Sequence, residues 1–255
     1  MRFKYLTGFY KKMKILSYLL SVIYYFFFGL TLVIMHVWQW LAYNLGNYSA
    51  HHSSVKIMNF LLIGCTKILG TSHQFSGKEK LPKGIPLIFV SNHQSMLDIS
   101  PVEWYLAEFH PKFISKKELG KGIPSVSYNL QKGGSALIDR KDPRQALPEI
   151  KKLAQFIQKN NYSAVIFPEG TRSRNGKLKH FHDSGLKMLV KFAPSAMIVP
   201  VTINNSWKIV KNGNFPLSLG VRFKVEIHEP IFPSEMSFEE LMEKTRTAIQ
   251  STLEN

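Results

Sequence analysis

His93 and Asp98 have the residue types and the spacing that general-base chemistry needs. They lie in the segment Ser91–Asp98, which directly follows the apolar run Ile88–Val90. In α/β sheets, ligands bind at the loops that leave the carboxyl ends of strands. A carboxylate can hold one nitrogen of a nearby imidazole, which leaves the other nitrogen to accept a proton from a hydroxyl. An isolated histidine and aspartate at this spacing more often mean a solvated side chain and a helix cap, so the interpretation depends on a second motif.

The segment Phe167–Ser173 supplies groups that suit an anion. It too follows a buried apolar run, Ala164–Ile166. Gly170 lets the backbone approach a ligand closely, the peptide N–H groups around Thr171 can point at oxygen atoms, and Arg172 offers a planar guanidinium that matches a phosphate. A plain turn with a surface arginine is the alternative for this segment taken alone. Together, the two segments predict a base beside a phosphate site.

The order and spacing of these two segments resemble those of the 1-acylglycerol-3-phosphate acyltransferase family, over roughly Leu81–Thr202. Gly134–Arg140 resembles the family's second block, with Lys116–Leu119 upstream, and Ile198–Thr202 resembles its fourth block. The resemblance implies an enzyme whose acyl donor is acyl-CoA or acyl-carrier protein and which needs no cofactor. The implied acceptor is 1-acylglycerol-3-phosphate, whose sn-2 hydroxyl receives the acyl group to give phosphatidic acid.

The resemblance also implies a role for each matching residue. His93 is the implied base and Asp98 is its orienting partner. The acceptor site is implied at six positions: Lys116, Arg140, Glu169, Gly170, Thr171 and Arg172. Pro200 is implied in acyl-donor binding or pocket shape, although its own neighbours predict only a core strand with a proline of the kind found at sheet edges.

Two features of these segments limit what the resemblance implies. Lys179–Gly185 stands where the family commonly has a basic stretch that ends in glycine, so another lysophospholipid or lipid amphiphile is the alternative acceptor. His180 and His182 lack a third ligand at a recognisable spacing, so no metal site is predicted. Ser95 lies close to His93, but a helix-capping role for Ser95 or Ser100 is favoured over a covalent serine mechanism.

The soluble part of the chain has the pattern of an α/β domain. We expect a mixed, mostly parallel sheet flanked by helices, of the glycerolipid acyltransferase kind. Short apolar runs of the buried type predict strands at Pro86–Ser91, Lys112–Ser115, Ser135–Ile138, Ser163–Phe167 and Met197–Ile203. Apolar residues at helical spacing predict a helix over Gln145–Asn160, and Ser237 with Glu240 predicts a capping box at the start of the last helix. The strict alternation over Val221–His228 predicts a half-exposed strand near a sheet edge, bordering solvent.

The first seventy residues have the pattern of a membrane anchor. Residues 1–14 carry Arg2, Lys4, Lys11, Lys12 and Lys14 without an acid, and no charged side chain of Asp, Glu, Lys or Arg occurs over residues 15–55. As one helix the apolar stretch over residues 15–43 would be about 43 Å long, more than a hydrocarbon core of about 30 Å. A cleaved signal peptide is disfavoured by this length.

Basic residues flank the apolar stretch on both sides, and this favours a helical hairpin over a single membrane span. A single span would export one basic flank, so we expect a hairpin whose second, interfacial helix covers Val55–Gly70, with the catalytic domain on the cytoplasmic face. A single-pass anchor is the alternative. We expect residues 1–70 to form the anchor and residues 71–255 the acyltransferase domain. Four aromatic residues are expected at the level of the lipid headgroups: Trp38, Trp40, Tyr43 and Tyr48.

Composition and charge narrow the class of partner. The 255 residues hold 33 Lys and Arg against 17 Asp and Glu, a net charge of +16 that favours a polyanionic partner. No nucleic-acid motif accompanies this charge, so a lipid bilayer is expected and nucleic acid is not. A single cysteine excludes a disulfide framework. A non-enzymatic, basic protein that binds anionic lipid remains the rival function.

Overall fold

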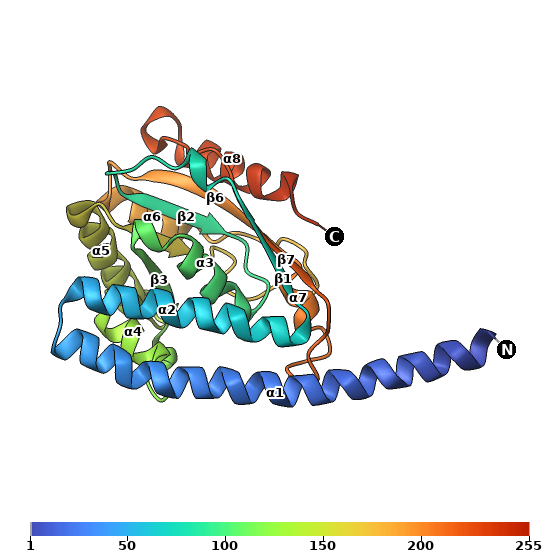
Figure 1. Cartoon of the computed structure of the whole chain (residues 1–255). Coiled ribbons are helices and arrows are strands. Elements are labelled where there is room, and N and C mark those ends of the chain that lie inside the picture. Colours follow the sequence, from blue (N-terminus) through green and yellow to red (C-terminus); the bar gives the residue numbers. More distant parts are fainter. Residues whose placement is uncertain (1, 255) are drawn as a thin grey trace.

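A computed structural model describes the backbone of residues 2–254. The side chains of residues 2–11 and 235 lie outside the described part, and with them the basic side chains of Arg2, Lys4 and Lys11. One mixed sheet forms the centre of the domain, with helices on both faces and a long helical hairpin along one side (Figure 1). The expected fold class is therefore confirmed.

Seven strands form the sheet in the order β1-β7-β6-β2-β5-β3-β4. All neighbours are parallel except β6 and β7. In β2, β5 and β6 every residue is buried, as expected for continuous apolar runs covered on both faces. The strands are β1 (Ser72–Ser76), β2 (Leu87–Ser91), β3 (Pro111–Lys116), β4 (Ala136–Ile138), β5 (Ser163–Ile166), β6 (Met197–Asn204) and β7 (Arg222–Ile227).

Eight α-helices complete the described chain: α1 (Arg2–Asn44), α2 (Tyr48–Thr66), α3 (Ile99–Tyr105), α4 (Val126–Lys132), α5 (Pro143–Asn160), α6 (Asp183–Phe192), α7 (Ser206–Ile209) and α8 (Phe238–Ser251). Alternate residues of the central strands β2, β3, β5 and β6 enter two cores. Phe89, with its neighbours on that face, packs against α3 and the hairpin. Ile88 and Val90 face α5, α6 and α8 on the other side. The predicted capping box of Ser237 and Glu240 opens α8.

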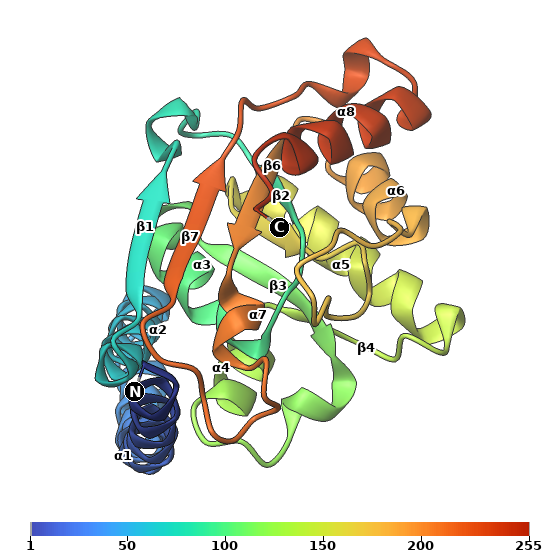
Figure 2. The ribbon, with the colours of Figure 1, turned by 90° about the vertical axis from the view of Figure 1, so that its right-hand side faces the viewer.

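The structure tests two expectations about the sheet edge. β7 lies near the edge, as expected, and its buried residues alternate with more exposed ones, but the edge strand itself is β1 (Ser72–Ser76), which the sequence did not predict (Figure 2). β6, which contains Pro200, is an interior strand between β7 and β2. The Pro200 carbonyl accepts from the His228 N–H just past the end of β7. In an antiparallel pair, the N–H and C=O of one residue face the same neighbouring strand, so the N–H that Pro200 lacks would have pointed toward β7. The hydrogen-bonded pairing of β6 with β7 ends at this position, so the missing donor is tolerated.

The N-terminal helices form an antiparallel hairpin, with α2 beginning at Tyr48 rather than near Val55 (Figure 1). A small core between the two helices contains Leu32, Met35, Met58 and Leu62. Tyr24 of α1 and Cys65 of α2 enter the main core of the domain, so the hairpin is packed onto the sheet layer.

Of the four aromatic residues expected at headgroup level, one is placed differently by the structure. Trp38, Trp40 and Tyr43 are exposed. The Tyr48 hydroxyl instead lies 3.0 Å from Lys112 Nζ and 3.1 Å from His110 Nδ1, both in the domain. Tyr48 therefore joins α2 to the sheet layer, which corrects the expectation for this residue.

Candidate active site

The strand order gathers the four sequence motifs at one edge of the sheet. Strands β6, β2, β5, β3 and β4 are parallel neighbours, so their carboxyl ends lie side by side. The loop with His93 leaves β2, the loop with Arg172 leaves β5, and Lys116 is the last residue of β3. Arg140 follows β4, and a turn at Asn205 follows β6. Ligands of open α/β sheets bind at such an edge.

His93 and Asp98 form a hydrogen-bonded pair. The loop after β2 ends in a short 3₁₀ turn over Met96–Asp98, in which the Ser95 hydroxyl accepts from the Leu97 N–H and the Asp98 carboxylate accepts from the Ser95 N–H, completing a capping box. This turn brings Asp98 Oδ2 to 2.8 Å from His93 Nδ1. Asp98 is thus both a cap and the partner of the histidine, and the expected capping role of Ser95 is confirmed.

The environment of Asp98 defines the protonation of the imidazole. Asp98 is fully buried, and its Oδ2 also accepts from the backbone N–H groups of Gln94 and Ser95 at 2.7 and 3.0 Å. A carboxylate with these donors is an acceptor only, so Nδ1 of His93 carries the proton. Nε2 then has its lone pair free, and no hydrogen bond within the described part of the chain engages it. This is the tautomer that a general base requires.

The His93 ring is held by packing as well as by hydrogen bonding. Phe167 stacks on the imidazole with ring centroids 4.2 Å apart and an angle of 21° between the planes. The His93 side chain keeps 12% of its surface exposed. Stacking and the Nδ1 contact fix the orientation of the ring, while the exposed part can reach a substrate hydroxyl.

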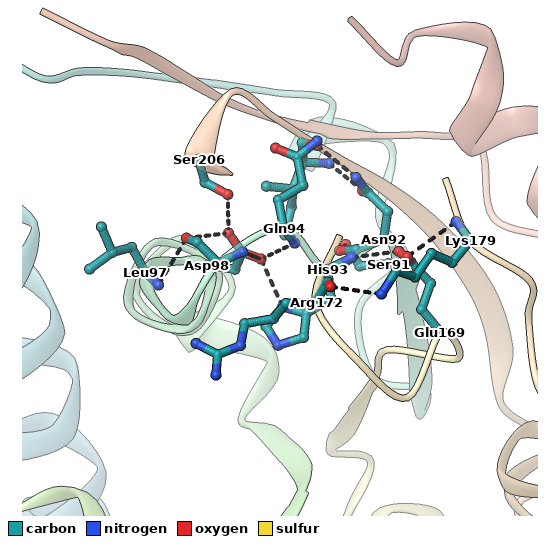
Figure 3. Close-up of polar contacts among 12 residues, drawn as sticks. Ser91, Asn92, His93, Gln94, Leu97, Asp98, Glu169, Arg172, Lys179 and Ser206 are labelled. Atoms are coloured by element: carbon teal, nitrogen blue, oxygen red, sulfur yellow. Dashed lines mark hydrogen bonds and ion pairs between the residues drawn. The ribbon is translucent and has the colours of Figure 1, made fainter. Parts of the chain in front are cut away.

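Hydrogen bonds join the segment Phe167–Ser173 directly to the segment Ser91–Asp98 (Figure 3). Glu169 is buried, and its Oε1 accepts from the His93 N–H at 2.8 Å while its Oε2 accepts from the Lys179 N–H at 3.2 Å. The Ser173 N–H donates to the His93 carbonyl at 2.7 Å. Burial raises the pKa of the Glu169 carboxyl, and the two N–H donors act against this shift. Glu169 thus holds together the loops that carry His93 and Arg172.

Two of the basic residues expected in the acceptor site, Arg140 and Arg172, lie close to Gly170. Gly170 has a φ of +64°, a conformation that favours glycine. The Arg140 guanidinium donates to the Gly170 carbonyl, and burial together with the nearby Arg172 lowers the pKa of Arg140. Two guanidinium groups this close repel each other, and an anion between them would relieve the repulsion.

The remaining predicted acceptor residues also lie at this edge. Thr171 and Arg172 are bridged by Lys179, whose Nζ donates to the Thr171 hydroxyl at 3.1 Å and to the Arg172 carbonyl at 2.8 Å. Within the described residues, no hydrogen bond engages the backbone N–H of Thr171 or Arg172. Lys116 is exposed at the end of β3. The loop therefore carries cationic groups and unpaired N–H donors, and it is hydrogen-bonded to the backbone of His93.

Three contributors to this geometry were not singled out from the sequence. Phe167 was seen only as part of a motif, and its stacking on His93 depends on the path of two separate strands. Lys179 was noted only as a departure from the family pattern. Asn92 clamps its loop to β6, accepting from the Ile203 N–H at 2.7 Å and donating to the Ile203 carbonyl at 2.8 Å. A paired side-chain amide of this kind leaves no spacing signal in one sequence.

Comparison with known proteins shows the family of the chain. Residues 72–204 match the family model described as Acyltransferase, which covers all four motifs. The fold and the matched residues define an acyltransferase, and the chain belongs to the acyltransferase family. It is 26% identical to the 1-acyl-sn-glycerophosphate acyltransferase PlsC of Thermotoga maritima, whose crystal structure superposes with a TM-score of 0.79 over 94% of this chain and 96% of that one.

Two relatives are named as acyltransferases of the same kind. A 1-acyl-sn-glycerol-3-phosphate acyltransferase of Helicobacter pylori is 36% identical over 165 residues, which is 62% of this chain and 65% of the relative. A chloroplastic 1-acyl-sn-glycerol-3-phosphate acyltransferase of Arabidopsis thaliana is 33% identical over 160 residues, or 62% of this chain and 43% of the relative. In both comparisons the match spans less than two thirds of the relative's own length.

Proposed function

We propose that the chain transfers a fatty acyl group from an acyl thioester to the sn-2 hydroxyl of 1-acylglycerol-3-phosphate at a membrane surface, giving phosphatidic acid. The observation that carries this proposal is the His93–Asp98 pair with a free Nε2, placed beside the cationic loop around Gly170. Acyl-CoA and acyl-carrier protein are both thioesters that this chemistry can use. The reaction needs no cofactor.

The mechanism follows from the tautomer of His93. Nε2 removes the proton from the acceptor hydroxyl as its oxygen attacks the thioester carbonyl, and a tetrahedral oxyanion forms. Asp98 stabilises the imidazolium through the Nδ1–H contact. Collapse of the intermediate breaks the carbon–sulfur bond, and the Nε2 proton passes to the departing thiolate. The products are the ester and a free thiol, and His93 returns to its starting state.

The acceptor phosphate is expected between Arg140 and Arg172, which makes Arg172→Ala a test of acceptor binding. A charge-assisted hydrogen bond to phosphate is worth about 1.5–3 kcal/mol, so the KM for lysophosphatidic acid should rise about tenfold or more. The KM for the acyl donor should change little. Steady-state kinetics with each substrate varied in turn measures both values. Arg246→Ala, in α8, is the matched control, and an equal rise in both KM values for Arg172→Ala would argue against a phosphate contact.

Membrane association is supported by the outward face of α1. The inward face packs on the protein through Tyr24, Leu32 and Met35. Two serines on α1 are also paired with the protein: the Ser17 hydroxyl donates to the Leu217 carbonyl at 2.6 Å, and the Leu217 N–H donates to the Ser21 hydroxyl at 2.8 Å. The outward face of α1 carries a stripe of exposed apolar residues at helical spacing, which are Ile15, Leu19, Val22, Phe26, Val33 and Val37. Water disfavours this arrangement and a lipid phase favours it. Residues 12–44 are also long and apolar enough to cross a membrane.

Charged substitutions on this stripe test the anchor better than deletion does, because α1 and α2 both contribute to the main core. In Phe26→Glu/Val33→Glu, vesicle association should fall at least about tenfold, since each buried apolar side chain contributes about 1.5–3 kcal/mol. Flotation with neutral phosphatidylcholine vesicles measures the effect without electrostatic attraction. Lys83→Glu, at an exposed position outside the hairpin, controls for added charge. Undiminished flotation of the double variant would remove the anchor from the proposal.

The direct test of the activity uses the purified full chain. It is incubated with labelled acyl-CoA and, separately, acyl-carrier protein, in vesicles that contain lysophosphatidic acid or other lysophospholipids, and products are identified by mass spectrometry. Phosphatidic acid as the main product supports the proposal. Acylation of another lysolipid only would show the alternative acceptor. Vesicle binding without acyl transfer would favour the non-enzymatic lipid-binding function.

A further inference from the structure

The turn after β6 places a serine against the buried carboxylate of Asp98. Ser206 is the first residue of α7, and its hydroxyl donates to Asp98 Oδ1 across 108 positions of sequence. Ser206 and Asp98 both have no exposed surface. The contact is visible in Figure 3, where Ser206 meets the carboxylate on the side opposite His93.

This contact completes the hydrogen bonding of the carboxylate. Oδ2 is saturated by His93 Nδ1 and the two backbone N–H groups. Oδ1 has only two donors among the described residues, the Ser206 hydroxyl and the more distant Ser95 hydroxyl at 3.3 Å. In a buried site an oxygen with one long hydrogen bond is poorly stabilised as an anion. Ser206 is therefore the main donor to this half of the charge.

Local structure does not explain the direction of the Ser206 side chain. The hydroxyl makes no capping bond in α7, a helix of only four residues whose N-cap is Asn205. The preceding turn is instead fixed from the opposite side by the C-terminal segment. Asn205 Nδ2 donates to Glu254 Oε2 at 2.7 Å. The Glu254 N–H in turn donates to Asn204 Oδ1 at 2.8 Å. The turn is thus held rigidly enough to position a donor.

We infer that Ser206 is a positioning residue of the active site, which fixes the plane and the charge of Asp98 and through it the orientation of His93. This gives the fourth motif a function, because β6 delivers Ser206 to the catalytic loop while Ile203 holds Asn92 of the same loop. The inference rests on the proposed general-base mechanism and deepens it.

The effect of removing the hydroxyl can be derived from the charges around the pair. The adjoining loop carries one anion, Glu169, which is hydrogen-bonded to the His93 N–H, and four cations, Arg172, Arg174, Lys177 and Lys179. Among the described residues, none of these donates a hydrogen bond to Oδ1. Without Ser206 the carboxylate is less stabilised as an anion, so the pair holds its proton more strongly. The acidic limb of the kcat/KM profile should therefore move to higher pH. The less constrained carboxylate should also lower kcat through poorer orientation of the imidazole.

The test compares Ser206→Ala with Ser206→Cys and with Ser163→Ala. Ser206→Ala should reduce kcat about tenfold, which corresponds to about 1.4 kcal/mol, and should shift the acidic limb upward by about one pH unit. The acceptor KM should stay within about twofold. Ser206→Cys keeps a donor at this position, but S–H is a weak one, so its values should lie between those of Ser206→Ala and the unmodified chain. Ser163 is a buried serine of β5 whose hydroxyl donates to the Phe109 carbonyl, far from the pair.

The outcomes separate the inference from the mechanism on which it rests. If Ser206→Ala and Ser163→Ala lose similar thermal stability but only Ser206→Ala shifts the pH profile, the positioning role is supported. If Ser206→Ala is active with an unshifted profile, or if the two variants behave alike in kcat, the positioning role is wrong. If the unmodified chain itself transfers no acyl group, the proposed function fails and the Ser206 experiment has no signal to lose. Circular dichroism of each variant establishes that it is folded.

Discussion

Replacement of His93 by Gln should lower kcat for acyl transfer by about 10³-fold or more. General-base catalysis contributes about 10²–10⁴, and a glutamine amide cannot accept a proton at neutral pH. Nε2 of His93 is the nitrogen without a hydrogen bond, and among the described residues no other imidazole contacts the Asp98 carboxylate. The substrates bind through other groups, chiefly the cationic loop, so the acceptor KM should change little. Initial rates at saturating thioester and lysophosphatidic acid measure the effect.

A matched control for the His93 variant comes from a second histidine. His228 is also partly buried, and its Nε2 lies 2.7 Å from the Thr202 hydroxyl, away from the catalytic loop. His228→Gln should therefore change stability without a comparable loss of kcat. Vesicle flotation should be unchanged in both variants, because the apolar stripe of α1 is untouched. Acyl transfer at an undiminished rate in folded His93→Gln would show that another group is the base.

The contribution of the sequence to the fold is clearest in the central strands. The runs that form β2, β5 and β6 are continuously apolar, and this pattern predicts strands covered on both faces. β1 was missed because Ser72–Ser76 contains mostly polar residues, and it is a strand only because β7 offers it a parallel partner. The strict alternation over β7 did predict its half-exposed character and its place near the sheet edge.

The site shows a similar division between what spacing reveals and what it does not. The close approach of His93 and Asp98 follows from a short turn, which local spacing predicts. The contacts of Glu169 with His93 and of Ser206 with Asp98 join loops far apart in sequence, and strand order alone brings them together. The outward apolar face of α1 shows the same limit. A long apolar run predicts a helix that contacts lipid, but it does not show which side of the helix packs on the protein. The contacts of Ser17 and Ser21 with Leu217 are visible only in the structure.

Asp98→Asn should lower kcat about 10²-fold while leaving the tautomer of His93 intact. Two backbone N–H groups point at the Oδ2 position, so the amide oxygen must occupy it and the amide NH₂ must face Ser206 and Ser95. Both hydroxyls can accept from this NH₂, and the oxygen still accepts from His93 Nδ1.

The substitution therefore removes the negative charge and keeps the geometry, which isolates stabilisation of the imidazolium from its orientation. A factor of 10² corresponds to about 2.7 kcal/mol. Without the carboxylate the imidazolium is less favoured, so the acidic limb of the kcat/KM profile should move to lower pH, opposite to the shift expected for Ser206→Ala. Asp98→Ala, which leaves three N–H donors unpaired in a buried site, should lose thermal stability in addition. If Asp98→Asn and Asp98→Ala had the same pH profile and the same kcat as the unmodified chain, Asp98 would be a helix cap and nothing more.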